Sequence, residues 1–470
     1  MLKSLIPLKI NKMKNILYIV ILAVFATSCD DWLDLQPKGK VIPSKVEDYR
    51  LLLDETQGRG EGSVIAAPDI DLWLTDDIDL RDDFIGRNYS KYQTNAFTFE
   101  DHFYLPSEED ESMGSVYASI YIFNTIIDEV LATDGDEDEK IKLYSEAKAH
   151  RAFAYLKLVN IYAKQYDATT AETDLGLPLR LVAILEGSLK RGSVADVYEL
   201  ILNDLTEAYD GLPETQVEFW RPSKASVNAI LARTHLIMGD FDMALNYADE
   251  ALGMYSELTD FNSLYPHYWY THILDFGQRY QYKEQFLLKA PPSDYITIYP
   301  SQEFMDLFDQ TNDLRFTGKI SPEWTFPETR LQWYHNAIGG AAYGVTVPEM
   351  ILTRAECNAR KGDSGVSAAM DDINLLRQNR IATAAYVPLT AANAAEALAI
   401  VKKERRMELA FMGHRFTDIR RYNAYDDANI SIVHTVEAET YTLAPGDNKW
   451  VVPFAEKYIL KNPEIEQNPR

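Results

Sequence analysis

The stretch from residue 228 to residue 252, NAILARTHLIMGDFDMALNYADEAL, holds two helical patterns separated by Gly239-Asp240. Apolar and small residues return every three or four positions in both halves, which is the spacing of an amphipathic helix. Leu231, Ala232, Ala244 and Ala251 stand where a 34-residue tetratricopeptide repeat places its packing residues. The stretch therefore predicts two closely packed antiparallel helices of the tetratricopeptide type.

A single pair of this kind cannot bury its apolar face, so other pairs should stack against it. A less regular second unit is predicted over Pro348–Arg380, with its turn at Gly362-Asp363. The same spacing predicts helices over residues 112–132, 141–162 and 196–212. The segments 113–162 and 196–252 are the candidates for stacking. We therefore expect an all-α fold built on a tetratricopeptide-like helical-repeat scaffold.

Two regions interrupt the helical pattern. Residues 54–111 combine a glycine-rich loop, an acidic stretch and scattered aromatic residues. Residues 261–345 hold 19 aromatic residues among 85 positions, well above the chain average of 12%, and several prolines that favour loops. Such rings either form a small core under long loops or are displayed for ligand contact. We expect most of them to be buried and a minority to be exposed.

The N-terminus has the features of an export signal. Lys12 and Lys14 precede the apolar run Ile16–Ala26, which leads to Cys29. About 20 apolar residues are needed to span a bilayer, so this run is too short. A cysteine at the cleavage point favours acylation of Cys29, with residues 1–28 as a lipoprotein signal peptide. The alternative is an ordinary signal peptide that is cut near Ser28 and leaves a free thiol.

The charge and cysteine content exclude several classes of function. Residues 1–28 contain four lysines and no acidic residue, so their removal changes the formal net charge from −26 to −30. This negative charge argues against nucleic-acid binding, which relies on clustered Lys and Arg. An anionic membrane would repel the chain, so an N-terminal lipid would have to supply the attachment. Only Cys29 and Cys357 occur, and we expect Cys357 to be a buried, small apolar residue.

Several blocks, in order along the chain, resemble the SusD/RagB family of outer-membrane nutrient-binding lipoproteins of the Bacteroidetes type. They are Ser28–Pro37, Ala147–Tyr162, Leu177-Pro178-Leu179, Tyr299–Phe304 with Asp313 and Arg315, Glu404–Arg415 continuing to Asp418 and Arg421, Lys461-Asn462-Pro463, and Gln467–Arg470. Met412 departs from the pattern, since the family usually has Glu at that position. The central aromatic region matches the family poorly.

This resemblance implies a scaffold of about four tetratricopeptide-like helix pairs, with ligand held by inserted loops. It implies one SusD-like domain over residues 29–470, divided into an N-terminal part, 29–260, and a C-terminal part, 261–470. It also implies an outer-membrane protein, lipid-anchored and facing the cell exterior. Its partner would be a TonB-dependent transporter of the SusC type, to which it passes oligosaccharides or, in some members, peptides.

Catalytic and metal-binding motifs receive no support. The chain lacks His-Glu-x-x-His, Gly-x-Ser-x-Gly and Walker sequences. Asp134–Glu139 contains enough carboxylates for a calcium ion, but its spacing is not that of an EF-hand loop. We therefore expect no catalytic residue, no metal and no cofactor. Buried charges must be paired, so we interpret one cluster as a structural ion network, formed by Glu404, Arg405, Glu408, Arg415, Asp418 and Arg421.

Sugar rings stack on flat aromatic side chains, and their hydroxyl groups bind to polar side chains. Our candidate ligand-binding residues are therefore taken from the two interrupted regions: Trp73, Asp76, Asp77, Arg81, Trp269, Tyr270, Trp324, Trp333 and Tyr334. The leading hypothesis is a non-enzymatic protein that captures oligosaccharides. The alternatives are a peptide importer of the same architecture, a surface glycoside hydrolase, and a helical scaffold that binds only other proteins.

Overall fold

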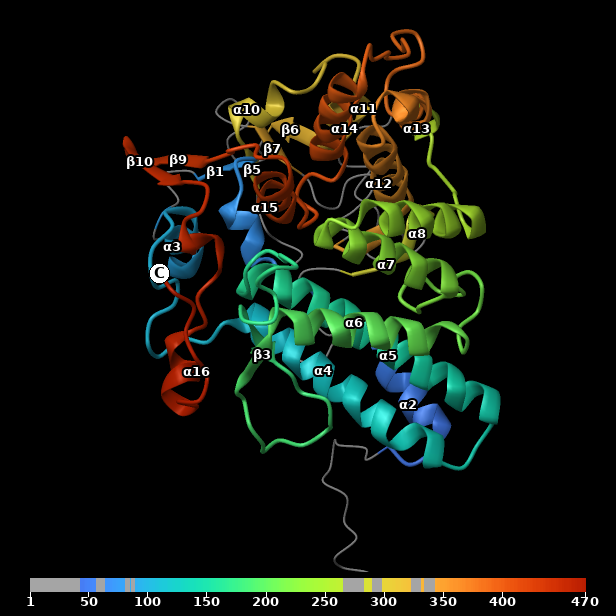
Figure 1. Ribbon diagram of the computed structural model, residues 1–470, viewed down its shortest axis with the longest axis vertical. Coiled ribbons are helices and arrows are strands. Elements are labelled where there is room, and N and C mark those ends of the chain that lie inside the picture. The colour runs from blue at the N-terminus through green and yellow to red at the C-terminus, as the bar shows by residue number, and fades with distance from the viewer. Residues whose placement is uncertain are drawn as a thin grey trace, which may run out of the picture.

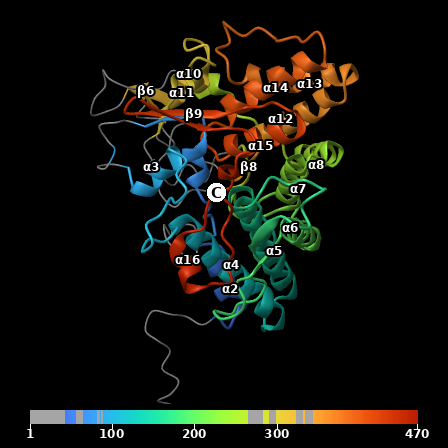
Figure 2. The same cartoon turned by 60° about the vertical axis from the view of Figure 1, so that its left-hand side comes forward.

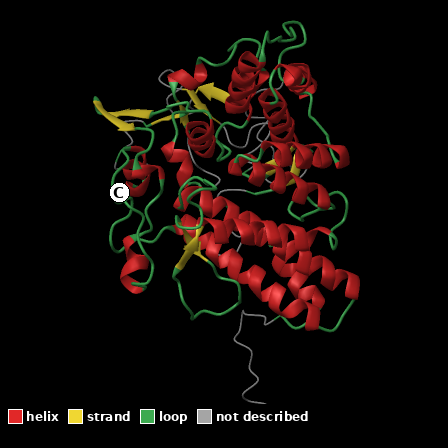
Figure 3. Ribbon diagram, in the orientation of Figure 1, coloured by secondary structure: helices red, strands yellow, loops and turns green. Residues whose placement is uncertain are grey.

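Helices dominate the computed structural model, which describes residues 43–55, 64–80, 85, 89–264, 283–289, 298–322, 331–333 and 343–470 (Figures 1 and 3). The α-helices are α2 Val46–Leu53, α3 Lys91–Phe97, α4 Glu111–Glu129, α5 Glu137–Tyr162, α6 Val194–Tyr209, α7 Lys224–Met238, α8 Phe241–Met254, α10 Gln302–Met305, α11 Leu314–Lys319, α12 Val347–Arg360, α13 Val366–Gln378, α14 Ala394–Glu408, α15 Arg415–Tyr425 and α16 Glu456–Lys461. The strands are β1 Ile78–Asp79, β2 Leu175–Pro178, β3 Arg191–Ser193, β4 Gln285–Leu287, β5 Tyr299–Pro300, β6 Ile320–Pro322, β7 Leu331–Trp333, β8 Val345–Thr346, β9 Ile432–Val436 and β10 Glu439–Leu443.

The helix pair predicted around Gly239-Asp240 is present as α7 and α8, which pack against each other. Gly239 ends α7 with φ of +79°, a left-handed conformation in which glycine is strongly preferred. Asp240 then begins α8, because its side chain accepts a hydrogen bond from the Met243 backbone N–H at 3.2 Å. The prediction of two helices joined at this turn is confirmed.

Further helices stack beside this pair, as expected. α4 packs on α5, α5 packs on α6, and α6 packs on α7 (Figure 1). The unit predicted over Pro348–Arg380 appears as α12 and α13, and α12 also packs on α8 and α14. The all-α, tetratricopeptide-like fold is therefore confirmed.

The strands are short and form antiparallel pairs: β1 with β5, β2 with β3, β4 with β8, β6 with β7, and β9 with β10. Most of them lie in or beside the two regions where the sequence loses its helical pattern. The short helices α10 and α11 in these regions were not predicted, and neither was α3. It has only seven residues, which is too short to produce a clear period, and it begins at Ser90 and Gln93 with a capping box.

One large apolar core extends from Val46 in α2 to Ile465 near the C-terminus and includes side chains from both halves of the chain. Cys357 is buried, as predicted, in a small cluster with Leu236, Ala244 and Leu245. This cluster joins α12 to the α7–α8 pair. Within the described part of the chain, no helix is long and apolar enough to cross a membrane.

Candidate ligand-binding site

Trp73 belongs to a short 3₁₀ helix, Ile70–Leu74, whose five residues are all buried. This segment lies against α3 and α15, and only 2% of Trp73 is exposed. Its ring meets the ring of Tyr89 edge-on, with 5.8 Å between centroids. Trp73 therefore fills the core and offers no open face to a sugar in this structure, contrary to the role we expected for it.

The carboxylates of Asp76 and Asp77 form ion pairs with arginines of the same chain. Arg415 donates two hydrogen bonds to Asp76, at 2.6 and 2.7 Å, and Arg406 donates one to Asp77 at 2.7 Å. Burial opposes ionisation of Asp76, but the hydrogen bonds and charge of Arg415, together with the charge of Arg406, outweigh it and lower the pKa of Asp76. The two carboxylates therefore hold the chain in place, and we correct our expectation that they are free to bind hydroxyl groups.

Hydrogen bonds and a strand pair secure the base of the first interrupted region to the second. Ser301 donates hydrogen bonds from its Oγ to the Asp76 carbonyl and from its N–H to the Asp77 carbonyl, both at 2.8 Å. Ile78 then pairs with Pro300, and Asp79 with Tyr299, in the β1–β5 ladder. Because the strands are antiparallel, the chain that leaves β1 and the chain that enters β5 meet at the same end of the ladder.

The second half of the aromatic region attaches beside this ladder. β7 lies next to β5 and pairs with β6, so that Pro322 faces Leu331 and Ile320 faces Trp333. Residues 81–84, 290–297, 323–330 and 334–342 are thus connected to strands that lie side by side. We call this group of strand ends, in β1, β5, β6 and β7, the loop edge.

Most of the remaining candidates fall outside the described residues, namely Arg81, Trp269, Tyr270, Trp324 and Tyr334. Trp333 is placed only through its backbone in β7. The loop edge therefore brings together the attachment points of both candidate regions, while the predicted ligand contacts themselves stay predictions.

The six residues of the predicted ion network are all ion-paired, but they form three separate groups. Arg415 belongs to the first group, with Asp76. In the second, Glu404 and Glu408 surround Arg315 at 3.0 and 3.2 Å, and Asp313 completes its coordination at 2.7 Å. Arg380 joins the same group by binding Glu408 and Glu284.

In the third group, Arg405 and Arg421 both bind Asp418, at 2.8 and 2.9 Å, and Arg421 also binds Glu356 at 2.5 Å. Burial of Glu356 opposes its ionisation, but the charge and hydrogen bonds of Arg421 outweigh that effect and lower its pKa. Buried carboxylates and guanidinium groups neutralise each other here. These ion pairs connect α12, α14 and α15, and we interpret them as fixing the positions of the three helices relative to one another.

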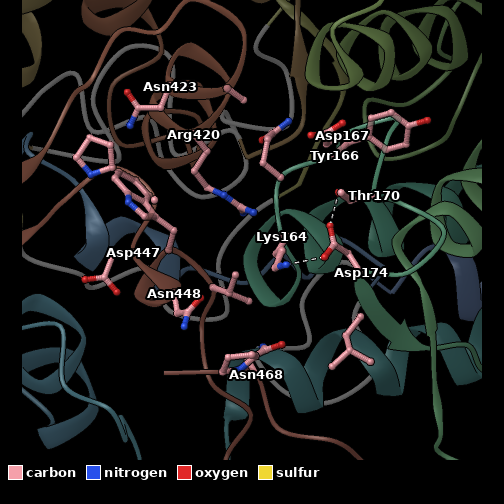
Figure 4. Close-up of a pocket in the computed structure, with 18 of the residues that line it drawn as sticks. Lys164, Tyr166, Asp167, Thr170, Asp174, Arg420, Asn423, Asp447, Asn448 and Asn468 are labelled. Atoms are coloured by element: carbon pink, nitrogen blue, oxygen red, sulfur yellow. Dashed lines mark hydrogen bonds and ion pairs between the residues drawn. The ribbon is translucent and has the colours of Figure 1, made fainter.

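A polar pocket of about 540 Å³ lies elsewhere on the molecule, where the chain after α5, helix α15 and the C-terminal segment meet (Figure 4). Lys164 and Thr170 both bind Asp174, at 2.6 Å, on one wall. Arg420 points into the pocket and donates to the carbonyls of Asn160 and Ala163 at the end of α5. Burial lowers the pKa of Arg420 to about 10.

Six further side chains of this pocket are of the kinds that bind hydroxyl groups. They are amides and carboxylates, accompanied by the rings of Tyr166 and Trp450: Gln165, Asp167, Asn423, Asp447, Asn448 and Asn468. Sequence reasoning did not find this pocket. Its walls come from segments far apart in the chain, and the one available signal, the loop Gly446-Asp447-Asn448, is typical of any turn.

Two family models match the chain. One, described as "Starch-binding associating with outer membrane", matches residues 31–236, and the other, the SusD family, matches residues 347–470. The chain belongs to the SusD family. This assignment agrees with the resemblance seen in the sequence.

Known proteins similar to this SusD family member include SusD-like protein P2 of Formosa agariphila, which is 27% identical over 249 residues. That alignment covers 49% of this chain but only 44% of the relative. Solved structures cover much more of the chain. A SusD superfamily protein of Bacteroides thetaiotaomicron is 18% identical, with a TM-score of 0.69, and the match covers 91% of this chain and 100% of that one. A protein described as a laminarin-binding SusD-like protein is 18% identical, with a TM-score of 0.61 and coverage of 90% and 98%. These structures support the SusD-type fold.

Proposed function

We propose that this SusD family member is a non-enzymatic lipoprotein of the outer-membrane surface that binds oligosaccharides. The family description, starch-binding and associating with the outer membrane, supports the ligand class and the location. Acylation of Cys29 would provide the membrane attachment. A TonB-dependent transporter of the SusC type would receive the bound sugar.

The observation that carries the proposal is the loop edge. Its strands draw the attachment points of both candidate regions together, and the pairs Asp76–Arg415 and Asp77–Arg406 hold the base in place. A rigid base lowers the entropic cost of ordering loops around a ligand. We assign sugar contact first to the rings of residues 323–330 and 334–342, which join these strands, whereas residues 265–282 connect Leu264 to the segment that enters β4.

The side chains assigned to ligand contact are Arg81, Trp269, Tyr270, Trp324, Trp333 and Tyr334. Tryptophan and tyrosine supply large, flat apolar surfaces at a low cost in side-chain entropy. Arginine supplies hydrogen-bond donors for hydroxyl groups. This combination suits a neutral oligosaccharide better than a peptide, which is recognised mainly through backbone hydrogen bonds.

The test is calorimetric titration of the mature chain, with Cys29→Ser to remove the lipid, against a panel of purified glycans and a mixed peptide digest. Saturable heat with one glycan class, without release of shorter products, is the expected result. Heat with peptides alone would transfer the assignment to peptide import. Appearance of cleaved glycan would overturn the non-enzymatic assignment.

Two sets of variants locate the site. Trp324→Ala and Trp333→Ala should each weaken glycan binding at least tenfold, because each removes a stacking surface at the loop edge. Asp447→Ala and Asn448→Ala, in the polar pocket, serve as matched controls and should change affinity less than twofold. The reverse pattern would assign the ligand to the polar pocket. Circular dichroism of every variant separates loss of binding from loss of folding.

A further inference from the structure

An apolar groove of about 940 Å³ lies between α4, the loop after β2 and the C-terminal segment around α16. Leu52 of α2 completes it. α2, α4 and α16 gather at one end of the molecule in both views (Figures 1 and 2). We call this surface the apolar groove.

Its walls are exposed to an unusual degree. Val182, Ile184 and Leu185 on the loop after β2 are 47%, 51% and 87% exposed, and Tyr121 on α4 is 39% exposed. Apolar side chains scattered singly over a surface need no explanation, but a contiguous apolar patch marks a binding surface. The groove is therefore a candidate binding surface.

The chain itself supplies a suitable occupant. Residues 30–42, DDWLDLQPKGKVI, directly precede Pro43 and α2, the helix whose Leu52 lines the groove. An extended chain advances about 3.3–3.6 Å per residue, so the eight residues from Leu35 to Pro43 span up to roughly 26–29 Å, and the eleven from Trp32 to Pro43 up to roughly 36–40 Å. α2 is eight residues long, or about 12 Å at 1.5 Å per residue. The segment is therefore long enough to run back along α2, so that Trp32, Leu33 and Leu35 can return to the part of the groove that Leu52 lines.

The charges also match. Arg180, on the wall of the groove, donates only to backbone carbonyls of its own loop and has no carboxylate partner among the described residues. Asp30, Asp31 and Asp34 alternate with the apolar residues of the segment. One of these carboxylates can neutralise Arg180 while the neighbouring apolar side chains enter the groove.

We propose that residues 31–36, Asp-Trp-Leu-Asp-Leu-Gln, dock in the apolar groove, with Trp32, Leu33 and Leu35 against α4 and the loop after β2. Docking places residue 29 beside this end of the molecule. If Cys29 is acylated, which rests on the proposed function, the end formed by α2, α4 and α16 faces the membrane.

Hydrogen exchange of the mature chain carrying Cys29→Ser tests the docking. Amides of residues 31–36 should exchange at least tenfold more slowly than in an isolated peptide of the same sequence. The double variant Ile184→Ser with Leu185→Ser should abolish this protection and increase the fluorescence of a bound hydrophobic dye. Exchange at the free-peptide rate in the unmodified protein would overturn the proposal.

Matched controls make the result specific. Val217→Ser and Val387→Ser remove similarly exposed apolar side chains, 62% and 67% exposed, that lie outside the groove, and they should leave the protection unchanged. Protection that survives the groove variants would also overturn the proposal. Glycan calorimetry is run on the same proteins, and because the groove lies apart from the loop edge, loss of docking should leave glycan affinity intact. The failure of one proposal can thus be distinguished from the failure of the other.

Discussion

Arg315 shows most clearly how individual charges support this fold. Its guanidinium is fully buried and binds Asp313, Glu404 and Glu408. Arg315→Met leaves these carboxylates without their shared cation, so we expect a loss of about 3–5 kcal/mol in the free energy of unfolding. Arg354→Met is the control, because Arg354 is 26% exposed while it binds Asp372 and Asp249, and should cost about 1 kcal/mol or less. Urea unfolding measures both, and equal losses would contradict the prediction.

Lys289 is a buried cation that has no carboxylate partner among the described residues, and it makes stability depend on pH. It donates to the Val64 carbonyl and to His150 Nδ1, and burial lowers its pKa to about 7. Between pH 7 and the ordinary lysine pKa near 10.4, the unfolded chain binds a proton here that the folded chain does not, so stability rises with pH. The stability advantage of the unmodified protein over Lys289→Met should therefore grow from pH 7 to pH 9, by at most about 1.4 kcal/mol per pH unit. A difference that stays constant across this range would show that Lys289 does not titrate in the native state.

The residue scale is also where sequence reasoning succeeded least. Trp73, Asp76 and Asp77 have the right chemistry for sugar binding, but their environment is decided by residues far along the chain. Arg406 lies 329 positions from Asp77, and Arg415 lies 339 positions from Asp76. A residue type reports what a side chain can do, whereas burial and partners decide what it does. The charges of the Glu404–Arg421 block were expected to be paired, but their partners Asp313 and Glu356 could not be named from spacing.

At the scale of an element, two properties of the turn between α7 and α8 require glycine: its left-handed backbone and the close approach of Tyr425. Alanine substitutions at three glycines separate the cost of the one from the cost of the other. Gly239 has φ of +79°, and a Cβ there would meet the ring of Tyr425 at 2.9 Å. That ring is held by hydrogen bonds from the Tyr425 hydroxyl to the carbonyls of Tyr166 and Ile237. Gly239→Ala should therefore destabilise the protein by about 2 kcal/mol or more, since left-handed backbone alone costs roughly 1–2 kcal/mol.

The two matched glycines isolate the causes. Gly446 has the same φ with open space around it, in the turn closed by the hydrogen bond from the Asp447 N–H to the Ala444 carbonyl, so Gly446→Ala should cost only the backbone term, about 1 kcal/mol. Gly253 lies in α8 with nothing within 4 Å, and Gly253→Ala should be neutral or stabilise by up to about 1 kcal/mol. Thermal unfolding ranks the three variants. A Gly239→Ala protein as stable as Gly253→Ala would contradict the role assigned to the turn.

Elements were predicted far better than side-chain environments. The patterns over 141–162, 196–212 and 228–252 correspond to α5, α6 and the α7–α8 pair, because helical period and capping residues are local properties of the chain. The five strand pairs were not predicted. Their strands are two to five residues long, and their partners lie up to more than 200 positions away, as in the β1–β5 ladder.

At the scale of the whole molecule, Cys357 can report whether the two halves separate. It lies between α12 and the α7–α8 pair, and burial raises the pKa of its thiol to about 12. In native Cys29→Ser protein we expect no measurable reaction with a thiol reagent, because the thiolate is the reactive form. In urea, labelling should begin together with the change in tryptophan fluorescence, since one core includes both halves. Labelling at lower urea concentration would show that the halves open before the core unfolds.

The ion pairs beneath the loop edge also determine the order in which parts of the protein can fold during synthesis. Asp77 is synthesised 329 residues before Arg406, and a ribosome adding about 5–20 residues per second needs on the order of tens of seconds to cover that distance. Throughout this interval Arg406 and Arg415, the native partners of Asp77 and Asp76, are still missing, and two ionised carboxylates favour water over a closed interior. The N-terminal helices can pack while the chain is still growing, but the base of the loop edge must wait for α14 and α15. The surface to which we assign ligand capture is thus among the last parts of the newly synthesised protein to fold.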